Sequence, residues 1–291
     1  MRKNFILVSG GAGYLGQNLI KQLIKLNKNV ISIDIKEFPF KHHHLKKITL
    51  NMTNYNHLLT KLKNLNISFI FHFAAISNIE YSVLNPKKTL NNNIFSTYNL
   101  LKIGNEKKIK KFIFASSIYT NSTQGSFYRI SKICCEEIIE EYQRLFGLKY
   151  IIVRYGSLFG DLNFTNTINN IISLGLKGKT IIREGSGREI RNYISIDDAV
   201  SLTIKLLEEK YNKSYYNIIG NEKINFKKII KIIKEHIPNL KIKYTNKIYN
   251  HHYIKSPYNK RKRLFYNLTI NKKNYFKNNI KNYIDFSDKY K

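Results

Sequence analysis

The chain has 291 residues, of which 43% are hydrophobic, and its 50 Lys and Arg against 19 Asp and Glu give a formal net charge of +31 at pH 7. This length allows one large domain or two closely joined ones. No run of eighteen apolar residues is present, so we expect no membrane span. The apolar stretch near the N-terminus leads into a glycine turn instead of a cleavage site, which favours a cytoplasmic protein.

The positive charge is spread along the chain and comes mainly from Lys, with only nine Arg. Because Arg is the residue favoured for bidentate readout of bases and phosphates, no nucleic-acid partner is expected. The one dense run, KRKR at residues 260–263, is interpreted either as solvated surface or as an anion-binding segment. The adjacent Cys134 and Cys135 favour packing in a reducing compartment. The three consecutive histidines at 42–44 lack a matching ligand cluster, so no metal site is expected.

The first predicted elements are a strand over residues 4–9 (NFILVS), a glycine-rich turn and a helix that includes residues 18–26. Gly10, Gly13 and Gly16 are spaced three apart in that turn. Such glycines allow a sharp exit from the strand, a close approach of backbone to a pyrophosphate, and packing of the helix on the sheet. The amino end of the helix then faces the negative charge, so the turn predicts a phosphate cradle.

A second predicted strand, at residues 29–34, ends in Asp34, twenty-four residues after Gly10. A carboxylate at this position accepts hydrogen bonds from both hydroxyls of an adenosine ribose and repels a 2′-phosphate. The glycine turn and this acid together predict a dinucleotide site that prefers NAD to NADP.

Further strands and helices alternate along the first half of the chain. The predicted strands cover residues 46–50, 68–75, 110–117 and 148–156, and the predicted helices include residues 57–65, 94–104 and 132–147. Alternating strands without a polar face are typical of a parallel sheet that is covered on both sides. We therefore expect an α/β fold with a doubly wound parallel sheet, a Rossmann domain, over residues 1–160.

The alternation loosens after residue 160. The expected elements there are a helix at 164–175, a Gly- and Arg-rich loop at 183–191, a helix at 197–210, a strand at 214–219 and two terminal helical stretches. They predict a smaller α/β lobe over residues 161–291, from which about 190–220 return to the first domain. Since ligands of open parallel sheets bind beyond the carboxyl ends of the strands, we expect this lobe to bind substrate over that edge.

Tyr128 and Lys132 begin a predicted helix and lie four residues apart, so both side chains lie on one helical face. An isolated Tyr titrates at about 10, but an adjacent ammonium and a positively charged nicotinamide stabilise the phenolate and bring its pKa towards neutrality. Ser116 and Ser117 end the preceding strand, where a hydroxyl can donate to the same substrate oxygen. The pattern indicates an acid/base site.

Taken together, the chain resembles the extended short-chain dehydrogenase/reductases and, within them, the NAD-dependent nucleotide-sugar epimerase/dehydratase family. The resemblance spans nearly the whole chain. It rests on SGGAGYLG, on IFHFAA at 70–75, on Ser82, Pro86 and Asn93, on FASS and YRISK, on VRYGSLFG at 153–160, and on GREIRNYISIDDAV at 187–200.

The resemblance implies a role for each matching residue. Tyr128 would be the acid/base, Lys132 would contact the nicotinamide ribose and lower the pKa of the tyrosine, and Ser117 would hold the reacting hydroxyl. The implied NAD contacts are Gly10, Gly13, Tyr14, Leu15, Gly16, Asp34, Asn51, Met52, Phe73, Ala74, Ala75, Asn93 and Lys132, and the implied substrate contacts are Ser157 and Arg191. Asn51 and Ser157 depart from the family's usual Asp and Asn.

Arg191 is expected to bind the diphosphate of a nucleotide sugar with its guanidinium fork, the alternative being a surface ion pair with Glu189. Relatives commonly form homodimers through a four-helix bundle, and here the matching helices lie near residues 90–103 and 128–146. A homodimer is therefore expected.

The residues after Ser117 bear on the reaction. Family dehydratases carry an acidic pair there, whereas this chain has Ile118 and Tyr119, which are not carboxylic acids. The sequence favours a 4-epimerase of the UDP-hexose or UDP-N-acetylhexosamine type, acting through a transient 4-keto sugar in surface polysaccharide biosynthesis. The alternatives are a nucleotide-sugar 4-ketoreductase or dehydrogenase and a non-catalytic NAD-binding regulator. The nucleotide and the sugar stay open.

Overall fold

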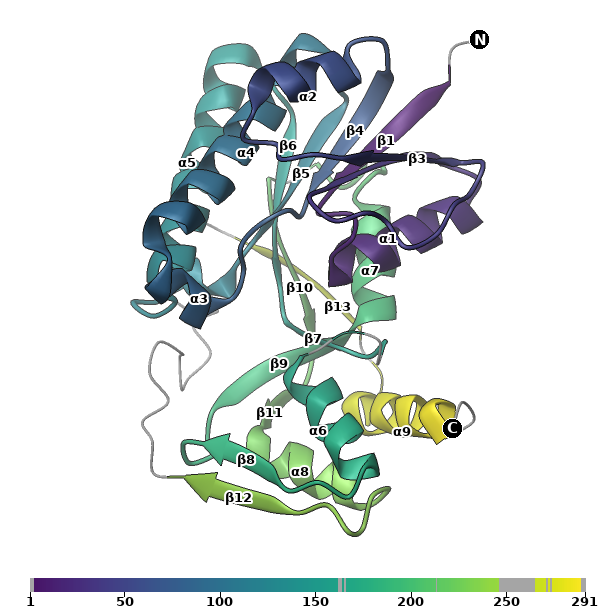
Figure 1. Ribbon diagram of the computed structural model, residues 1–291, viewed down its shortest axis with the longest axis vertical. Helices are drawn as coiled ribbons and strands as arrows, with labels where there is room; N and C mark the ends of the chain where they lie inside the picture. The colour runs from purple at the N-terminus through teal and green to yellow at the C-terminus, as the bar shows by residue number, and fades with distance from the viewer. Residues whose placement is uncertain are drawn as a thin grey trace.

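The computed structural model describes residues 3–161, 164, 166–212, 214–245, 265–270, 272 and 274–288. The basic run at 260–263 lies outside these residues. The described chain forms a large sheet with helices on both faces and a smaller lobe beyond one edge of that sheet (Figure 1). In the described residues, the lobe is built from short strands and three helices, the last of which is also the last described helix of the chain.

The large sheet has eight strands in the order β13-β10-β6-β5-β4-β1-β2-β3, and all of its pairs are parallel. Its strands are β1 (Asn4–Ser9), β2 (Asn29–Asp34), β3 (Leu45–Thr49), β4 (Asn66–His72), β5 (Lys111–Ser116), β6 (Tyr150–Tyr155), β10 (Tyr215–Gly220) and β13 (Tyr266–Ile270). The expected doubly wound parallel sheet is thus confirmed. The strand order reverses between β1 and β4, and this reversal opens a crevice at the carboxyl ends of the strands.

Helices cover both faces of this sheet (Figure 1). On one face lie α1 (Tyr14–Lys25) and α7 (Ile196–Lys205), and on the other lie α2 (Tyr55–Leu62), α4 (Pro86–Glu106), which follows the short α3 (Ile79–Leu84), and α5 (Ser126–Phe146). Successive residues of a strand point to opposite faces. Accordingly Ile6 and Val8 pack under α1 and α7, while Leu7 packs under α2, α4 and α5.

The smaller lobe contains a three-stranded sheet and a two-stranded sheet. Its elements are β7 (Ser157–Phe159), α6 (Thr167–Leu176), β8 (Ile181–Glu184), β9 (Ile190–Ser195), β11 (Lys223–Asn225), α8 (Phe226–Lys234), β12 (Ile242–Thr245) and α9 (Tyr275–Asp288). Most of its core residues are isoleucines and phenylalanines. Strands β10 and β13 join the large sheet from beyond residue 160, so the two parts are not separated by a single cut of the chain.

Three elements predicted beyond residue 160 have other limits in the structure. Helix α6 begins at Thr167 because the side chain of Asn166 caps it by accepting from the amide of Asn169. Helix α7 ends at Lys205 instead of 210. The predicted loop at 183–191 contains the end of β8 and the start of β9, since strands of four to six residues give little hydrophobic periodicity.

The two parts meet where the end of β10 crosses β9. A Cβ atom at Gly220 would lie 1.9 Å from the carbonyl oxygen of Tyr193, so no side chain fits there. The carbonyl of Gly220 accepts a hydrogen bond of 3.0 Å from the side chain of Asn192 in β9. The crossing therefore depends on direct backbone contact between the large sheet and the lobe.

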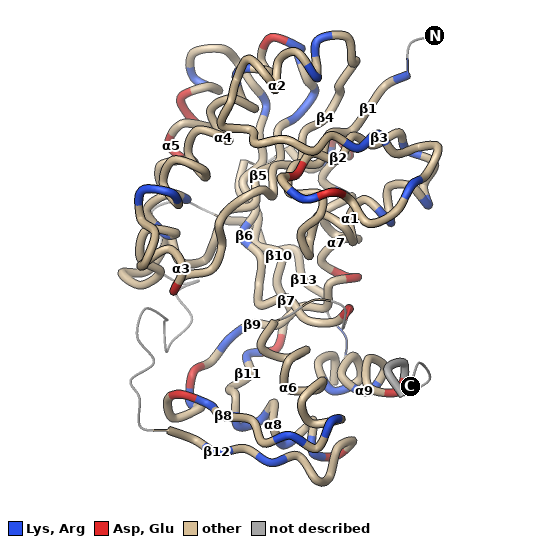
Figure 2. Tube along the Cα trace, in the orientation of Figure 1, with Lys and Arg blue, Asp and Glu red and all other residues tan. Residues whose placement is uncertain are grey.

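Lys and Arg residues are scattered along both parts of the described chain (Figure 2). Among the helices of the described residues, none is both long and apolar enough to cross a membrane. The even distribution agrees with the sequence, in which the charge excess is not confined to one segment.

Candidate active site

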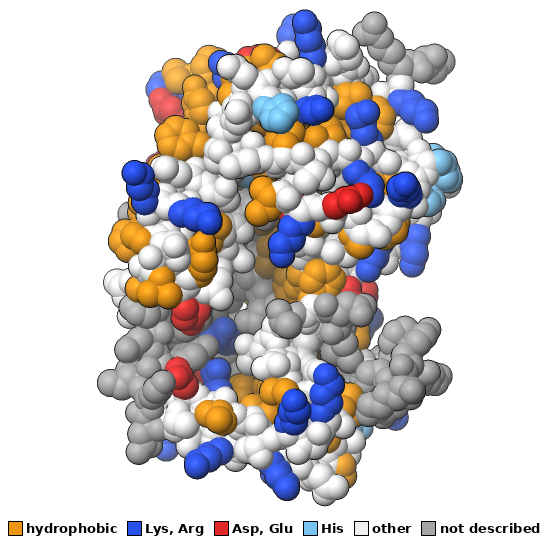
Figure 3. Space-filling model, in the orientation of Figure 1, with side chains coloured by type: hydrophobic (Ala, Val, Ile, Leu, Met, Phe, Trp, Pro, Cys, Tyr) orange, Lys and Arg blue, Asp and Glu red, His pale blue; other side chains and the backbone are white. Residues whose placement is uncertain are grey.

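A cavity of about 650 Å³ lies between the carboxyl edge of the large sheet and the lobe. Figure 3 shows the molecule hollowed between these two parts. The cavity brings together nearly all residues proposed from the sequence: Gly10, Gly13, Tyr14, Leu15, Gly16, Asp34, Asn51, Met52, Phe73, Ala74, Ala75, Ser117, Tyr128, Lys132, Ser157 and Arg191 line it. Asn93 is absent from this lining.

The glycine turn forms one end of the cavity. A Cβ atom at Gly16 would lie 2.1 Å from the carbonyl oxygen of Gly10, so α1 can begin this close to the turn only with glycine there. Gly13 is the N-cap of α1; no side chain caps the helix, and its first turn holds no acidic residue. The free amide groups and the positive end of the helix dipole suit a diphosphate, so this end of the cavity fits a dinucleotide.

Asp34 is held at the tip of β2 by two backbone amides. Its Oδ2 accepts from the amide of Ala12 and its Oδ1 from the amide of Lys36, each at 3.0 Å. The carboxylate thereby lines the cavity beside the glycine turn, where an adenosine ribose would lie. Asn51 also lines the cavity, with its Oδ1 accepting from the amide and the hydroxyl of Thr53 at 3.1 and 3.0 Å. These contacts fit the adenosine half of NAD.

Ser117, Tyr128 and Lys132 come together in the part of the cavity beside β5 and α5. Ser117 follows β5 and is the N-cap of a short 3-10 helix, η1 (Ile118–Asn121), while Tyr128 and Lys132 lie in the first two turns of α5. The hydroxyl of Ser117 is hydrogen-bonded to that of Tyr128. The Nζ atom of Lys132 donates to the carbonyl of Ala115 at 2.7 Å and lies 5.9 Å from the ring centre of Tyr128. One hydroxyl donor, one phenol and one ammonium thus face a common space.

The lowering of the pKa of Tyr128 is expected for the complex with NAD and stays a prediction. Burial raises the pKa of Tyr128 above its usual value, and the hydrogen bond from Ser117 only opposes that rise. Burial also lowers the pKa of Lys132 to about 8, with Cys135 and Glu136 acting in the opposite direction. The positive charge of oxidised nicotinamide, which is part of that expectation, would have to offset the rise that burial causes in the pKa of Tyr128.

Asn93 does not face the cavity, contrary to the expected cofactor contact. It is buried in α4, where its Oδ1 accepts from the amide of Ile76 at 2.7 Å. Its Nδ2 donates to the carbonyl of Ile76 at 3.1 Å and to the hydroxyl of Ser131 at 2.9 Å. The side-chain amide is therefore used inside the protein, where it ties the segment after β4 to α5. The neighbouring Asn92 and Ser96 line the cavity instead.

His72 is a buried residue that sequence reasoning passed over, although it belongs to the IFHFAA motif. Its Nδ1 lies 2.6 Å from the hydroxyl of Ser9 and its Nε2 lies 2.8 Å from that of Thr97. The Thr97 hydroxyl donates to the carbonyl of Asn93, so it accepts from Nε2–H, and Nδ1 accepts from Ser9. Burial holds the pKa of His72 well below its usual value, with the charge of Lys132 adding to the effect. The neutral ring links β1, β4 and α4 behind the cavity.

The lobe supplies the opposite wall of the cavity. Ser157 lies at the start of β7 and Arg191 lies in β9, and both line the cavity. Glu189, the alternative partner considered for Arg191, forms an ion pair with Arg183, whose guanidinium lies 4.5 Å from the ring centre of Phe226. Arg191 thus contributes a positive charge to the cavity wall, as a site for an anionic substrate requires.

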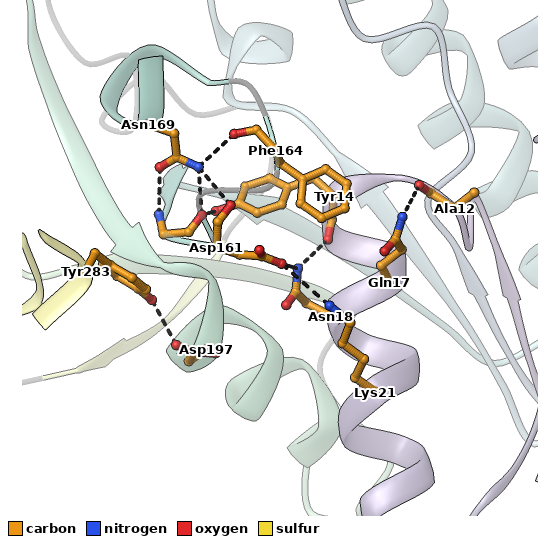
Figure 4. Close-up of polar contacts among 11 residues, drawn as sticks. Ala12, Tyr14, Gln17, Asn18, Lys21, Asp161, Phe164, Asn169, Asp197 and Tyr283 are labelled. Atoms are coloured by element: carbon orange, nitrogen blue, oxygen red, sulfur yellow. Dashed lines mark hydrogen bonds and ion pairs between the residues drawn. The ribbon is translucent and has the colours of Figure 1, made fainter. Parts of the chain in front are cut away.

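A polar network joins the glycine turn to the lobe (Figure 4). The hydroxyl of Tyr14 donates to the carbonyl of Gly160 at 2.5 Å, and Asn18 donates to Oδ2 of Asp161 at 3.0 Å. On the lobe side, the Nδ2 of Asn169 donates to the carbonyls of Gly160 and Phe164 at 2.8 and 2.9 Å. Helix α1 and the segment that leads into α6 are therefore connected directly. No local pattern signals these bonds, which join residues up to 146 positions apart.

An open parallel sheet with this glycine turn, an acid after its second strand and a Tyr-x-x-x-Lys helix defines an extended short-chain dehydrogenase/reductase with an NAD site. The comparison with known families agrees. The model of the "NAD dependent epimerase/dehydratase family" matches residues 6–219, and the chain belongs to this family. Its members described so far include more than one nucleotide-sugar chemistry, as two relatives illustrate.

The chain is 28% identical over 261 residues to a UDP-glucuronate 4-epimerase of Thermodesulfobacterium geofontis, covering 79% of this chain and 80% of that protein. It is 29% identical over 254 residues to a dTDP-D-glucose 4,6-dehydratase of Dictyostelium discoideum, covering 73% of this chain and 57% of that protein. The solved UDP-glucose 4-epimerase of Thermotoga maritima superposes with a TM-score of 0.82 at 22% identity, covering 98% of this chain and 99% of that one. This last likeness establishes the fold.

Proposed function

We propose that the protein is an NAD-dependent nucleotide-sugar 4-epimerase of the UDP-hexose or UDP-N-acetylhexosamine type, working in the cytoplasm in surface polysaccharide biosynthesis. The observation that carries the proposal is that Ser117, Tyr128 and Lys132 line one cavity. Ile118 and Tyr119, which come directly after Ser117 in the sequence, line the same cavity. Ser117, Tyr128 and Lys132 can together transfer a proton to and from a sugar hydroxyl. Ile118 and Tyr119 carry no carboxylic acid, which a dehydration would need.

In this function Tyr128 takes the proton from the sugar's C4 hydroxyl, which Ser117 holds by a hydrogen bond. The ammonium of Lys132 stabilises the phenolate form of Tyr128 that accepts this proton, a form that burial alone disfavours. When bound, NAD supplies a hydride acceptor and later the hydride donor. Once the 4-keto sugar has turned over in the cavity, Tyr128 would return the proton to its C4 oxygen, so that the opposite configuration is obtained with no net redox change. Gly13 to Gly16 and Asp34 would hold the cofactor at the other end of the cavity.

We assign the recognition of the substrate's diphosphate to Arg191, because its guanidinium can bind two phosphate oxygens in parallel. Ser157 would contact the sugar or the uridine. The epimerase and dehydratase relatives are equally distant in identity, so similarity does not choose between the two reactions. The choice rests on Ile118 and Tyr119.

We also propose a homodimer formed through α4 and α5. Phe95, Tyr98 and Phe146 on these helices are 52%, 42% and 54% exposed. Figure 3 shows hydrophobic side chains gathered on the side of the molecule where these helices lie. A second copy that packs the same helices against them would remove this apolar surface from water. Light scattering after size-exclusion chromatography should give twice the mass of the chain, and Phe95→Lys should shift the mass towards that of a monomer.

The reaction itself can be tested by NMR. Purified protein should convert UDP-glucose or UDP-N-acetylglucosamine to the galacto form without added cofactor, because the redox change over a full cycle is zero. A 4-ketoreductase would instead oxidise one equivalent of added NADH per product formed. Loss of water from the sugar would identify a dehydratase and reject the epimerase. Absence of turnover with UDP-, GDP- and dTDP-sugars would reject the proposed function as a whole.

A further inference from the structure

A buried ion pair lies directly behind the catalytic trio. Glu136 follows Lys132 by one turn of α5 and has no exposed surface, and Arg154, near the end of β6, is 2% exposed. The Nη2 atom of Arg154 lies 3.2 Å from Oε1 and 3.1 Å from Oε2 of Glu136. Two charges are rarely buried in this way unless further hydrogen bonds compensate them, so their other contacts are informative.

Those contacts lead to the segment that carries the serines. The hydroxyl of Ser116 donates to Oε1 of Glu136. The Nη1 atom of Arg154 donates to Oδ1 of Asn121 at 2.8 Å, at the end of η1. Its guanidinium also lies 3.8 Å from the ring centre of Phe265. The pair therefore holds the last residue of β5 and the last residue of η1, the two ends of the segment that contains Ser117.

We propose that Glu136 and Arg154 are positioning residues of the active site, which fix the segment from Ser116 to Asn121 so that the hydroxyl of Ser117 faces Tyr128. Consecutive residues at the end of a strand point to opposite sides. Both serines line the cavity, but the hydroxyl of Ser116 is bound to Glu136, which leaves the hydroxyl of Ser117 for the cavity. This inference rests on the proposed function, because it assigns the pair a place in that reaction.

The pair has a second effect, on the charge of Lys132. The groups around the ammonium are Tyr128, Cys135 and Glu136 from α5, the carbonyl of Ala115 from β5, and neutral His72 from β4. Among them Glu136 is the carboxylate, and it opposes the fall that burial causes in the pKa of Lys132. Removing Glu136 also leaves the charge of Arg154 unbalanced nearby. Both changes lower the pKa of Lys132 further.

The test compares Glu136→Gln and Ser116→Ala with the whole wild-type protein, and uses Glu235→Gln as the matched control. Glu235 is the carboxylate of an exposed ion pair with Lys277, at 2.7 Å in the lobe. We expect kcat to fall about a hundredfold in Glu136→Gln and about tenfold in Ser116→Ala, the scale of a small misplacement of reacting groups. The KM for the nucleotide sugar and the Kd for NAD should stay within about twofold in both variants.

The pH profile separates positioning from general stability. Protonated Lys132 is the active form, so wild-type activity should fall as the pH rises through about 8. This fall should move to lower pH in Glu136→Gln and stay in place in Ser116→Ala, which keeps both charges. The ¹³C shift of the Lys132 ε-carbon, assigned by its loss in Lys132→Met, should report the same difference without turnover.

Each result decides the proposal. If Glu136→Gln binds NAD but keeps kcat within twofold and leaves the Lys132 titration unmoved, the pair is not a positioning device. If Glu136→Gln does not fold, Ser116→Ala decides, and an unchanged kcat there overturns the proposal. If the wild type turns over no nucleotide sugar, the proposed function fails. The Lys132 titration of Glu136→Gln, or of Glu136→Gln with Arg154→Gln, then still tests the electrostatic link.

Discussion

Both parts of the molecule bury polar side chains, but in different places. Next to Ser117, Tyr128 and Lys132, such side chains join strands to helices, as His72, Asn93 and the Glu136–Arg154 pair do. In the lobe, Asn169 and the Arg183–Glu189 pair hold the segments that enter α6 and β9, and the core is mostly isoleucine and phenylalanine. Hydrogen bonds fix direction, whereas apolar packing tolerates changes of shape that conserve volume. We infer that the proposed chemistry depends on fixed hydrogen bonds, and that the lobe, to which we assign substrate binding, accepts more changes of shape.

The largest expected effect belongs to the large sheet. Tyr128→Phe keeps the ring but removes the proton carrier, so turnover should fall by about 10²–10⁴, the range typical of a lost general acid/base. Because the phenol does not touch the glycine turn, the Kd for NAD, measured by fluorescence titration, should change less than about threefold. A variant that keeps wild-type turnover would show that Tyr128 is not the acid/base.

The cores of the two parts can be compared with one matched pair of substitutions. Ile229 in α8 and Leu58 in α2 are both completely buried. Ile229→Ala and Leu58→Ala should each lower the free energy of unfolding by about 2–5 kcal/mol, measured in urea. Only Ile229→Ala should also raise the KM for the nucleotide sugar, because it loosens the lobe. If both variants changed the KM equally, the assignment of substrate binding to the lobe would be wrong.

Arg191 tests the assignment of substrate binding to the lobe. Arg191→Met keeps much of the side chain's length but removes the guanidinium. Hydrogen bonds to charged groups contribute about 1.5–3 kcal/mol, so the KM for the nucleotide sugar should rise about 10- to 150-fold. The Kd for NAD should remain unchanged in the same preparation. A large loss of NAD affinity would place Arg191 with the cofactor and not with the substrate.

The smallest expected effect concerns pH and His72. Burial holds the pKa of His72 well below 6.5, so on acidification the unfolded chain takes up a proton before the folded protein does. The stability that the neutral ring provides is therefore complete above pH 6.5 and is lost as the pH falls. The stability difference between wild type and His72→Gln should shrink by about 1.4 kcal/mol per pH unit below 6.5. Parallel curves from urea unfolding between pH 7 and pH 5.5 would contradict the buried neutral state.

The sequence predicted the cavity well because its residues belong to short local motifs. The glycine turn, the acid after β2 and the Tyr-x-x-x-Lys helix each need particular residue types at fixed spacing, and the structure places them around one cavity. The parallel sheet was predictable for a similar reason, since its buried strands are continuous apolar runs. Both signals lie within stretches of about ten residues.

What the sequence did not reveal depends on distant partners. His72 is bonded to Ser9, 63 residues away, and nothing near either residue indicates the contact. Asn93 was assigned to the cofactor because a motif does not tell which way a side chain points inside a helix. The direction of the pKa shift of Tyr128 depends on burial, which only the folded structure shows. The short strands of the lobe lack a periodicity long enough to detect.

The crossing at Gly220 limits how this protein can be re-engineered. With 1.9 Å between its would-be Cβ and the carbonyl oxygen of Tyr193, the junction accepts no side chain on β10. A chimera that takes its lobe from another protein, in order to act on other sugars, should therefore keep Gly220 together with β9, the strand that crosses it. Recombination sites that separate β9 from Gly220 should give insoluble chimeras. Sites within the lobe, away from this crossing, should leave the large sheet and its part of the cavity intact.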